Sequence, residues 1–146
     1  MFSGSFLYTL DSKNRLSIPA KLRKNLLPES KDSFVITQGL GNCLDLYPQD
    51  EWQNIIKRLR QLNQFDPNER KFTRMLLQNA IDVEMDNQAR IILPQNLIQL
   101  ANIEKEVFIL GSLDKIELWN PKIYNEYISN SPDNYEQLAA KVMMGK

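Results

Sequence analysis

The chain has 146 residues, with eighteen basic and eighteen acidic side chains, one cysteine and no histidine. This length accommodates one domain with a sizeable core, or two small units that share one core. The absence of histidine removes the commonest general base and the commonest imidazole metal ligand, which excludes histidine-based catalytic triads and zinc sites. The formal net charge of zero argues against a nonspecific nucleic-acid coat protein.

Cysteine usage and hydropathy indicate a reducing, aqueous compartment. Cys43 is the only cysteine, so we expect a small buried hydrophobic residue without a disulfide or a metal. The longest apolar runs, such as 91–93 and 107–110, are far too short to span a membrane, and no basic-then-apolar leader is seen. We therefore expect a cytoplasmic protein that has no membrane association and no cofactor.

The first predicted element is a strand, because Phe6, Tyr8 and Leu10 fall on one face. A polar turn follows, and then a short apolar segment that ends at Pro19. This proline can stand near the first turn of a helix, which we predict over about residues 20–26. The remaining elements of this half are strands near 34–36 and 44–47 and a helix with an apolar stripe of Trp52, Ile55, Ile56, Leu59 and Leu62.

The next helix is predicted to begin at Asp66, with Pro67 at the first helical position and Glu69 as the acidic residue of a capping box. A strand follows over 81–86, where apolar and acidic residues alternate. We expect the apolar stripe that runs from Trp52 to Leu62, and the later stripe near 123–128, to pack on the sheet. The later elements are a helix over about 95–101, strands near 107–109 and 116–119, an apolar stripe of Ile123, Tyr124, Tyr127 and Ile128, a helix start at Ser131 and Pro132, and a final stripe of Tyr135, Leu138, Ala139 and Val142.

The chain repeats itself at an offset of 75 residues. Residues 11–19 (DSKNRLSIP) and 86–94 (DNQARIILP) both read Asp-x-x-x-Arg-apolar-x-apolar-Pro. The later strands also correspond in the two copies, which indicates two homologous halves, residues 1–80 and 81–146. Because no Gly-, Ser- or Pro-rich linker separates them, we expect one compact body with pseudo-twofold symmetry.

Two Asp-x-x-x-Arg units of this length and order resemble the MraZ family, whose halves are similar to AbrB-type swapped-hairpin units. The resemblance covers nearly the whole chain, from Phe2 to Met144. It implies an α+β fold in which two AbrB-like swapped-hairpin half-units interlock in one β-barrel with flanking amphipathic helices. Since AbrB itself carries one unit per chain, the fused pair suggests that each chain completes a barrel alone.

The same resemblance implies a function. It points to a sequence-specific, DNA-binding transcriptional regulator of the division and cell-wall gene cluster, associated with the nucleoid, that binds tandem promoter repeats containing GTG. It also implies ring-shaped homo-oligomers, such as an octamer. The expected partners are therefore double-stranded DNA and further copies of the chain.

Local charge separates the two halves. Residues 11–31 hold six basic and two acidic side chains, a net charge of +4, whereas residues 86–106 hold two basic and three acidic side chains, a net charge of −1. Only the first half therefore has the charge expected for phosphate contacts. We predict that residues 1–80 face the DNA.

Lys13 and Arg15 are the leading candidates for DNA contact, because Lys or Arg on an exposed turn can bind phosphates or the O6 and N7 atoms of guanine. Ser12 and Asn14 are short polar residues that can hydrogen-bond to base edges or to the DNA backbone from the same turn. The residues predicted to position the complex through phosphates are Lys21, Arg23 and Lys24 of the following helix.

The two Asp–Arg pairs also have a structural interpretation, as an alternative to DNA contact. Asp11 with Arg15, and Asp86 with Arg90, can simply close each turn by an ion pair and backbone hydrogen bonds. We favour this structural role for Arg90. For Arg15 we favour DNA contact, although its side chain can also organise the loop while Lys13 reaches the groove.

For two further sets of residues, structural roles are expected rather than DNA contact. The basic clusters of the later helices are typical of solvated faces or of a protomer interface, and comprise Lys57, Arg58, Arg60, Arg70, Lys71 and Arg74. The aromatic residues at equivalent positions of the two halves are expected in the core rather than in base stacking, and comprise Tyr47, Trp52, Trp119 and Tyr124.

Two rival functions follow from other features. Asp82, Glu84 and Asp86 alternate along one strand face, where they can form an acid-base pair or bind Mg²⁺ in an enzyme. The solvent side of an ordinary strand shows the same pattern, and no phosphate-cradling Gly-rich loop or nucleophile elbow accompanies it, so we expect no enzyme. The other rival is a protein-binding ring scaffold or an AbrB-like, antitoxin-type interaction protein.

Overall fold

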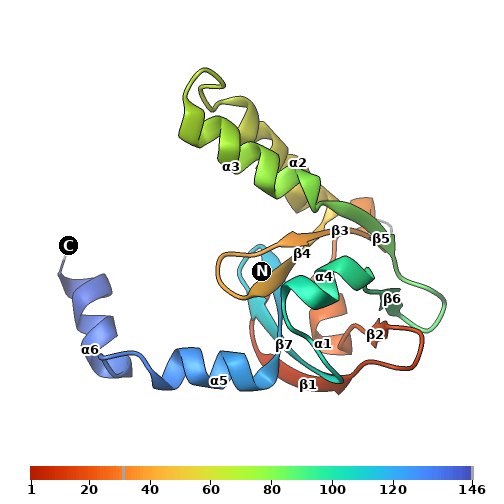
Figure 1. Cartoon of the computed structure of the whole chain (residues 1–146). Coiled ribbons are helices and arrows are strands. Elements are labelled where there is room, and N and C mark those ends of the chain that lie inside the picture. Colours follow the sequence, from red (N-terminus) through yellow and green to blue (C-terminus); the bar gives the residue numbers. More distant parts are fainter. Residues whose placement is uncertain (31, 146) are drawn as a thin grey trace.

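The computed structural model describes residues 1–30 and 32–145 as a mixed α+β fold (Figure 1). Lys31, counted above among the basic residues of the first half, lies outside the described residues. The strands are β1 (Ser5–Thr9), β2 (Arg15–Ser17), β3 (Ser33–Gln38), β4 (Cys43–Pro48), β5 (Ile81–Glu84), β6 (Arg90–Ile92), β7 (Glu106–Ser112) and β8 (Lys115–Trp119). The helices are α1 (Ala20–Arg23), α2 (Gln49–Arg60), α3 (Pro67–Gln78), α4 (Gln95–Leu100), α5 (Pro121–Ser129) and α6 (Tyr135–Ala139), with a 3-10 turn η1 (Pro28–Ser30) and a π-helical turn η2 (Ala140–Met144).

Six strands form one antiparallel sheet in the order β1-β7-β8-β4-β3-β5. Three of its five ladders join strands from different halves of the chain: β1 with β7, β8 with β4 and β3 with β5. The α+β class is confirmed. The predicted closed barrel is not seen among the described residues, because β1 and β5 remain the edges of the sheet.

The remaining two strands, β2 and β6, pair only with each other, in antiparallel register with Leu16 opposite Ile91. Each has three residues and is followed two residues later by a proline, Pro19 or Pro94, after which a helix begins. Proline has no N–H to donate to a ladder, so these strands end early. The β2–β6 pair therefore does not connect β1 to β5, the two edge strands of the large sheet.

One hydrophobic core takes side chains from both halves, as expected when a unit of this size cannot bury enough apolar surface alone. The side chains that are less than 2% exposed include Leu16, Phe34, Ile36, Leu44 and Leu46 from the first half and Ile91, Leu93, Leu97, Ile109, Ile116 and Leu118 from the second. Strand alternation sends Leu44 and Leu46 to this core and the intervening Asp45 to the opposite face.

Asp45 carries a carboxylate that is buried in the middle of the sheet, with only 3% of the residue exposed. The Nζ atom of Lys115 lies 2.9 Å from Asp45 Oδ2 and 3.5 Å from Glu117 Oε2. Asp45 Oδ1 has no hydrogen-bond partner among the described residues and faces Gly39, where a Cβ would stand 2.8 Å away. Burial raises the pKa of Asp45, and Lys115 opposes this shift. Lys115 therefore stabilises the ionised form of Asp45.

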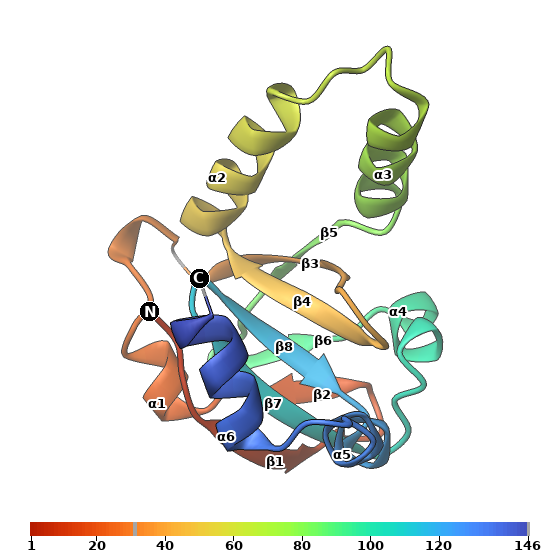
Figure 2. The ribbon, with the colours of Figure 1, turned by 90° about the vertical axis from the view of Figure 1, so that its left-hand side faces the viewer.

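Two helical arms leave the sheet on one side, as Figures 1 and 2 show: α2 with α3, and α5 with α6. Packing on the sheet is confirmed for α2, which buries Trp52 and Leu59, and for the start of α5, where the Tyr124 ring stacks on Phe108 at 4.4 Å. The last helix, α6, has no buried residue, since residues 130–134 lead it away from the sheet (Figure 1). The exposed apolar residues of the arms are Phe65, Phe72, Met75, Leu77, Tyr127, Ile128, Tyr135, Leu138, Val142, Met143 and Met144.

The predicted start of α3 agrees with the structure, whereas the predicted start of the last helix does not. Asp66 caps α3, since its Oδ2 accepts a hydrogen bond of 2.8 Å from the N–H of Glu69. The Glu69 carboxylate accepts from the N–H of Asn63 rather than completing a capping box. The last helix does not begin at Ser131, because that hydroxyl donates to the Asp133 carbonyl in a turn. Asn134 caps α6 instead.

Candidate nucleic-acid interface

The Asp-x-x-x-Arg motif of the first half builds a rigid turn between β1 and β2, here called the first turn (residues 11–15). Asp11 Oδ1 accepts hydrogen bonds of 2.9 Å from the backbone N–H groups of Lys13 and Arg15. Asp11 Oδ2 accepts a hydrogen bond of 2.6 Å from Arg15 Nε. One carboxylate thus fixes the backbone of the turn and the arginine that closes it.

The second copy builds the same turn between β5 and β6, here called the second turn (residues 86–90). Asp86 Oδ1 accepts from the N–H groups of Gln88 at 2.8 Å and Arg90 at 3.0 Å, and Asp86 Oδ2 accepts from Arg90 Nε at 2.9 Å. Each of the three hydrogen bonds accepted by the Asp11 carboxylate therefore has its counterpart 75 residues later. Both Asp–Arg ion pairs are therefore present, and each closes its turn together with backbone hydrogen bonds.

Both turns contain a residue in the left-handed backbone region. Asn14 has φ of 60° and Ala89, at the equivalent position, has φ of 59°. Asparagine tolerates this region well, whereas the Cβ of alanine clashes with the backbone there. The second turn is therefore more strained than the first.

Replacing Ala89 by glycine is expected to raise the free energy of unfolding by about 0.5–1 kcal/mol, because glycine adopts positive φ without a steric cost. Chemical denaturation of Ala89→Gly and of wild type at one pH measures the difference. Asn14→Ala is the matched control in the first turn and is expected to destabilise. A destabilised Ala89→Gly would contradict the assignment of strain to this turn.

The ionisation of Asp11 links the first turn to pH. The N–H of Arg15, with the other donors of the turn, lowers the pKa of Asp11 to about 2 from 3.8. A lowered pKa in the folded state stabilises the fold above 3.8, and that contribution is lost as pH falls through about 2. The stability advantage of wild type over Asp11→Asn is therefore expected to shrink over this range in acid-dependent unfolding curves. An advantage that does not change with pH would contradict it.

Each turn is held by the opposite half of the chain. The Asn14 carbonyl accepts from the N–H of Leu93, and the Ala89 carbonyl accepts from the N–H of Ile18, both at 2.9 Å. Asn14 Nδ2 also donates to Gln95 Oε1 of α4 at 3.0 Å. The first turn therefore rests against α4, a helix of the second half that has no charged residue. Sequence reasoning missed Gln95, because only the pairing of β2 with β6 brings it there.

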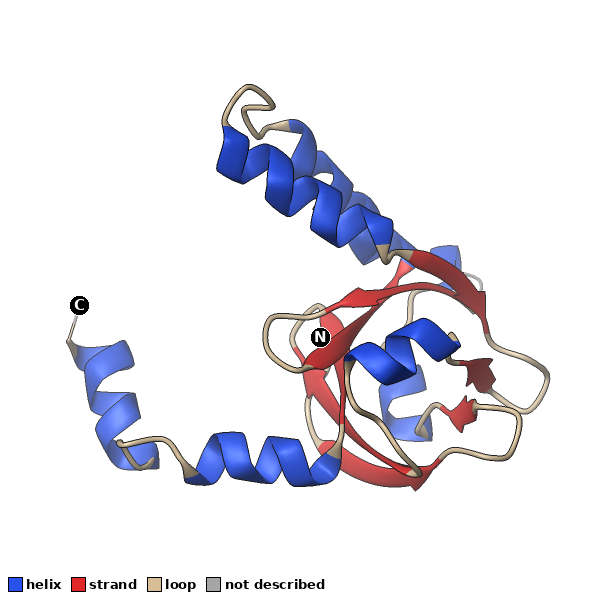
Figure 3. Ribbon diagram, in the orientation of Figure 1, coloured by secondary structure: helices blue, strands red, loops and turns tan. Residues whose placement is uncertain are grey.

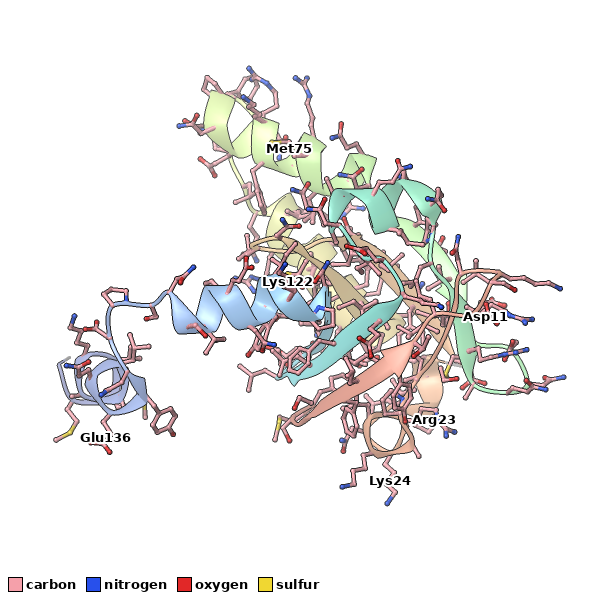
Figure 4. All side chains as sticks on the ribbon, turned by 60° about the horizontal axis from the view of Figure 1, so that its bottom comes forward. Asp11, Arg23, Lys24, Met75, Lys122 and Glu136 are labelled. Atoms are coloured by element: carbon pink, nitrogen blue, oxygen red, sulfur yellow. The ribbon has the colours of Figure 1, made fainter. Side chains whose placement is uncertain are left out.

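The converse contact places α1 beside the second turn. Arg23 of α1 lines one surface depression together with Asp86, Asn87 and Ala89, and its Nε donates to the carbonyl of Ile18 at 3.0 Å. In Figure 4, Arg23 and Lys24 lie on a different part of the surface from Asp11. The basic residues of the first half that the structure describes therefore do not gather in one patch. Lys13 and Arg15 belong to the first turn, and Arg23 borders the second.

The tips of both turns face solvent. Ser12 and Lys13 are exposed in the first turn, and Asn87 and Gln88 are exposed in the second. Within the described residues Lys13 has no ion-pair partner, so its ammonium group is available to a ligand. Lys21 and Arg23 of α1 are also exposed, as is Lys24 just after this helix. All the polar and basic residues proposed for DNA contact are thus at the surface, except that Asn14 and Arg15 are half-buried.

The acidic strand and the cysteine have ordinary structural surroundings. Asp82 and Glu84 are exposed, and Asp86 is bound to Arg90. No group of three His, Cys, Asp or Glu side chains in residues 1–30 and 32–145 is placed to hold a metal ion. Cys43 is 2% exposed, and burial raises the pKa of its thiol to about 12, so the thiol stays protonated at neutral pH.

The later basic clusters and the aromatic pairs lie away from the turns. Lys57, Arg58 and Arg60 are exposed on α2, and Lys71 and Arg74 are exposed on α3, with Arg70 half-buried. Packing of the paired aromatic residues is confirmed. The ring centroids of Tyr47 and Trp52 are 5.6 Å apart, and those of Trp119 and Tyr124 are 5.1 Å apart. In the described part of the chain, every helix is too short or too polar to cross a membrane.

Comparison with known proteins identifies the family to which this chain belongs. The model of the family described as "MraZ protein, putative antitoxin-like" matches residues 1–75 and again residues 76–143. "Transcriptional regulator MraZ" of Halothermothrix orenii is 41% identical over 140 residues, which cover 96% of this chain and 95% of the relative. The proteins of the same name from Thermoanaerobacter sp. and Syntrophomonas wolfei are each 39% identical and cover 94% and 97% of their own lengths, and 95% and 98% of this chain.

Proposed function

Because this chain belongs to the MraZ family, we propose that it is a sequence-specific DNA-binding regulator of transcription. Its relatives are named transcriptional regulators, and the family is not an enzyme family. We further propose that the regulated genes are the division and cell-wall cluster, and that the protein binds tandem promoter repeats containing GTG. It then works in the cytoplasm, on the nucleoid.

The single observation that carries this proposal is the first turn, where the exposed Lys13 follows an aspartate that accepts two hydrogen bonds from the backbone of the turn and one from the Arg15 side chain. A preformed cationic tip loses little conformational entropy on binding. Lys13 and Arg15 then contact guanine edges or phosphates in the major groove. Ser12 and Asn14 add hydrogen bonds from the same turn. The phosphate contacts that orient the complex come from Lys21, Arg23 and Lys24.

The proposal treats residues 1–80 and 81–146 as two AbrB-like swapped-hairpin repeats in one pseudo-twofold body, with the first repeat facing DNA. It also includes a ring of identical chains. The exposed apolar residues of the two arms support self-association, because apolar surface of this kind is a common protein interface. A ring presents the same turn to successive promoter repeats at high effective concentration, which offsets the net charge of zero.

Salt dependence tests the electrostatic part of the proposal. Affinity for duplex DNA from immediately upstream of the gene is measured by fluorescence anisotropy at several salt concentrations. The logarithm of affinity is expected to fall linearly with the logarithm of salt concentration, with a slope of about −0.9 for each phosphate neutralised. A complex that is insensitive to salt would contradict phosphate binding by these side chains.

The exposed apolar arms also favour a second candidate, a ring scaffold or antitoxin-type protein that binds another protein. Met143 and Met144 are 79% and 82% exposed at the end of the second arm. Under this alternative, replacing Lys13 and Arg15 by alanine leaves partner binding unchanged, and DNA affinity shows no salt dependence. The anisotropy series above therefore separates the two candidates.

A further inference from the structure

We infer that the second turn, together with Arg23, is a second point of DNA contact in each chain. This inference rests on the proposed function and adds a site to it. Charge counted along the sequence assigns DNA contact to the first half alone. The structure places α1 of the first half beside the second turn, so that Arg23 lines the same surface depression as Asp86, Asn87 and Ala89.

The scaffold of the second turn equals that of the first. Asp86 organises its backbone and its arginine with the same three hydrogen bonds, and the Ala89 carbonyl is fixed by Ile18 as that of Asn14 is fixed by Leu93. Gln88 occupies the position of Lys13, and Asn87 that of Ser12. The second turn therefore presents two exposed amide side chains on a tip that the same Asp–Arg scaffold fixes.

Asparagine and glutamine amides suit base edges, since each donates and accepts and can bind N6 and N7 of adenine together. The cation that such a tip lacks is provided by Arg23, which borders the same depression as Asn87. Its Nε is bound to Ile18, which orients the guanidinium and leaves its terminal nitrogens for a phosphate. The acidic groups of the depression are Asp32 and Asp86, and Asp86 is already neutralised by Arg90.

The two turns are placed so that one duplex can meet both. They stand at opposite ends of the short antiparallel β2–β6 ladder, where Ser17 pairs with Arg90 and Arg15 with Ile92. Figures 1 and 3 show both loops projecting from the same side of the molecule, opposite the helical arms. A duplex lying across this side therefore contacts the basic first tip and the amide-bearing second tip together.

The variant Gln88→Lys tests this inference by giving the second tip the charge of the first. The first turn itself shows that lysine fits this position, because Lys13 N donates to Asp11 Oδ1 as Gln88 N donates to Asp86 Oδ1. The matched control is Gln64→Lys, an equal charge change at an exposed position in the α2–α3 loop. Both proteins and wild type are compared by anisotropy on the same upstream duplex over a salt series, after thermal unfolding has verified the fold.

For Gln88→Lys we expect tighter binding at low salt and a salt slope steeper by about 0.9 per engaged chain, which is a further loss of about 3.5-fold between 50 and 200 mM salt. Gln64→Lys is expected to keep the wild-type slope. If wild type binds with a salt slope and the two variants behave alike, the inference is wrong and the proposed function stands. If wild type itself shows no salt-dependent binding, both fail.

Discussion

Arg15→Ala is expected to lower the affinity for the upstream promoter DNA by about 5- to 150-fold, the range of one bidentate contact of arginine to guanine. The chain contains its own control for this experiment. Arg15 and Arg90 make the same ion pair to the aspartate four residues earlier, and their side chains are 28% and 25% exposed. A loss of DNA affinity that is larger for Arg15→Ala than for Arg90→Ala therefore reports a contact of Arg15 with DNA rather than the loss of the ion pair.

Both variants are expected to lower the free energy of unfolding by a similar amount, about 1 kcal/mol or less, since each pair is partly exposed. Arg90→Ala is expected to keep most of the affinity, because Asp86 still accepts from two backbone N–H groups of the second turn. Denaturation curves and anisotropy titrations of the two proteins measure both quantities. Loss of binding in a folded Arg90→Ala protein, with Lys13→Ala unaffected, would reverse the roles of the two turns.

Lys115→Met is expected to give the largest loss of stability, about 3 kcal/mol at neutral pH. The substitution keeps the length of the side chain but leaves the Asp45 carboxylate buried without its cation, and a buried charge without a partner is strongly destabilising. Because burial raises the pKa of Asp45, the carboxyl group can protonate as pH falls. The deficit of the variant relative to wild type is therefore expected to shrink in acid.

Asp45→Asn in the Lys115→Met background provides the control, because the double variant removes both charges of the pair. It is expected to recover much of the stability lost in the single variant, since replacing both members of a buried ion pair costs far less than removing one. Urea denaturation at neutral and acidic pH compares wild type, Lys115→Met and the double variant. A Lys115→Met protein as stable as wild type would show that this pair contributes nothing to the fold.

Local structure followed closely from the sequence. The Asp-x-x-x-Arg repeat predicted two equivalent turns, because an aspartate that precedes a tight turn can accept its backbone N–H groups. Alternation of apolar residues predicted the strands of both halves, and Asp66 followed by Pro67 predicted the start of α3. Burial of Cys43 followed from its being the only cysteine in an apolar strand.

Long-range pairing could not be predicted in this way. The sequence groups Arg23 with Lys13, ten residues away, whereas the structure places Arg23 beside Asn87, because β2 pairs with β6 and carries α1 across to the other half. The same pairing brings Gln95 to Asn14. The paths of the arms were missed for a related reason, since the apolar stripe of α6 predicts a covered face without saying which surface covers it.

The central claim is that exposed side chains on a preformed turn recognise a particular DNA sequence. The most direct test is the affinity for duplex DNA from immediately upstream of the gene, divided by the affinity for a shuffled duplex of the same length and composition, at physiological salt. A sequence-specific regulator is expected to prefer its own site by about 10³-fold or more. Equal affinity of the intact, assembled protein for the two duplexes would contradict the claim.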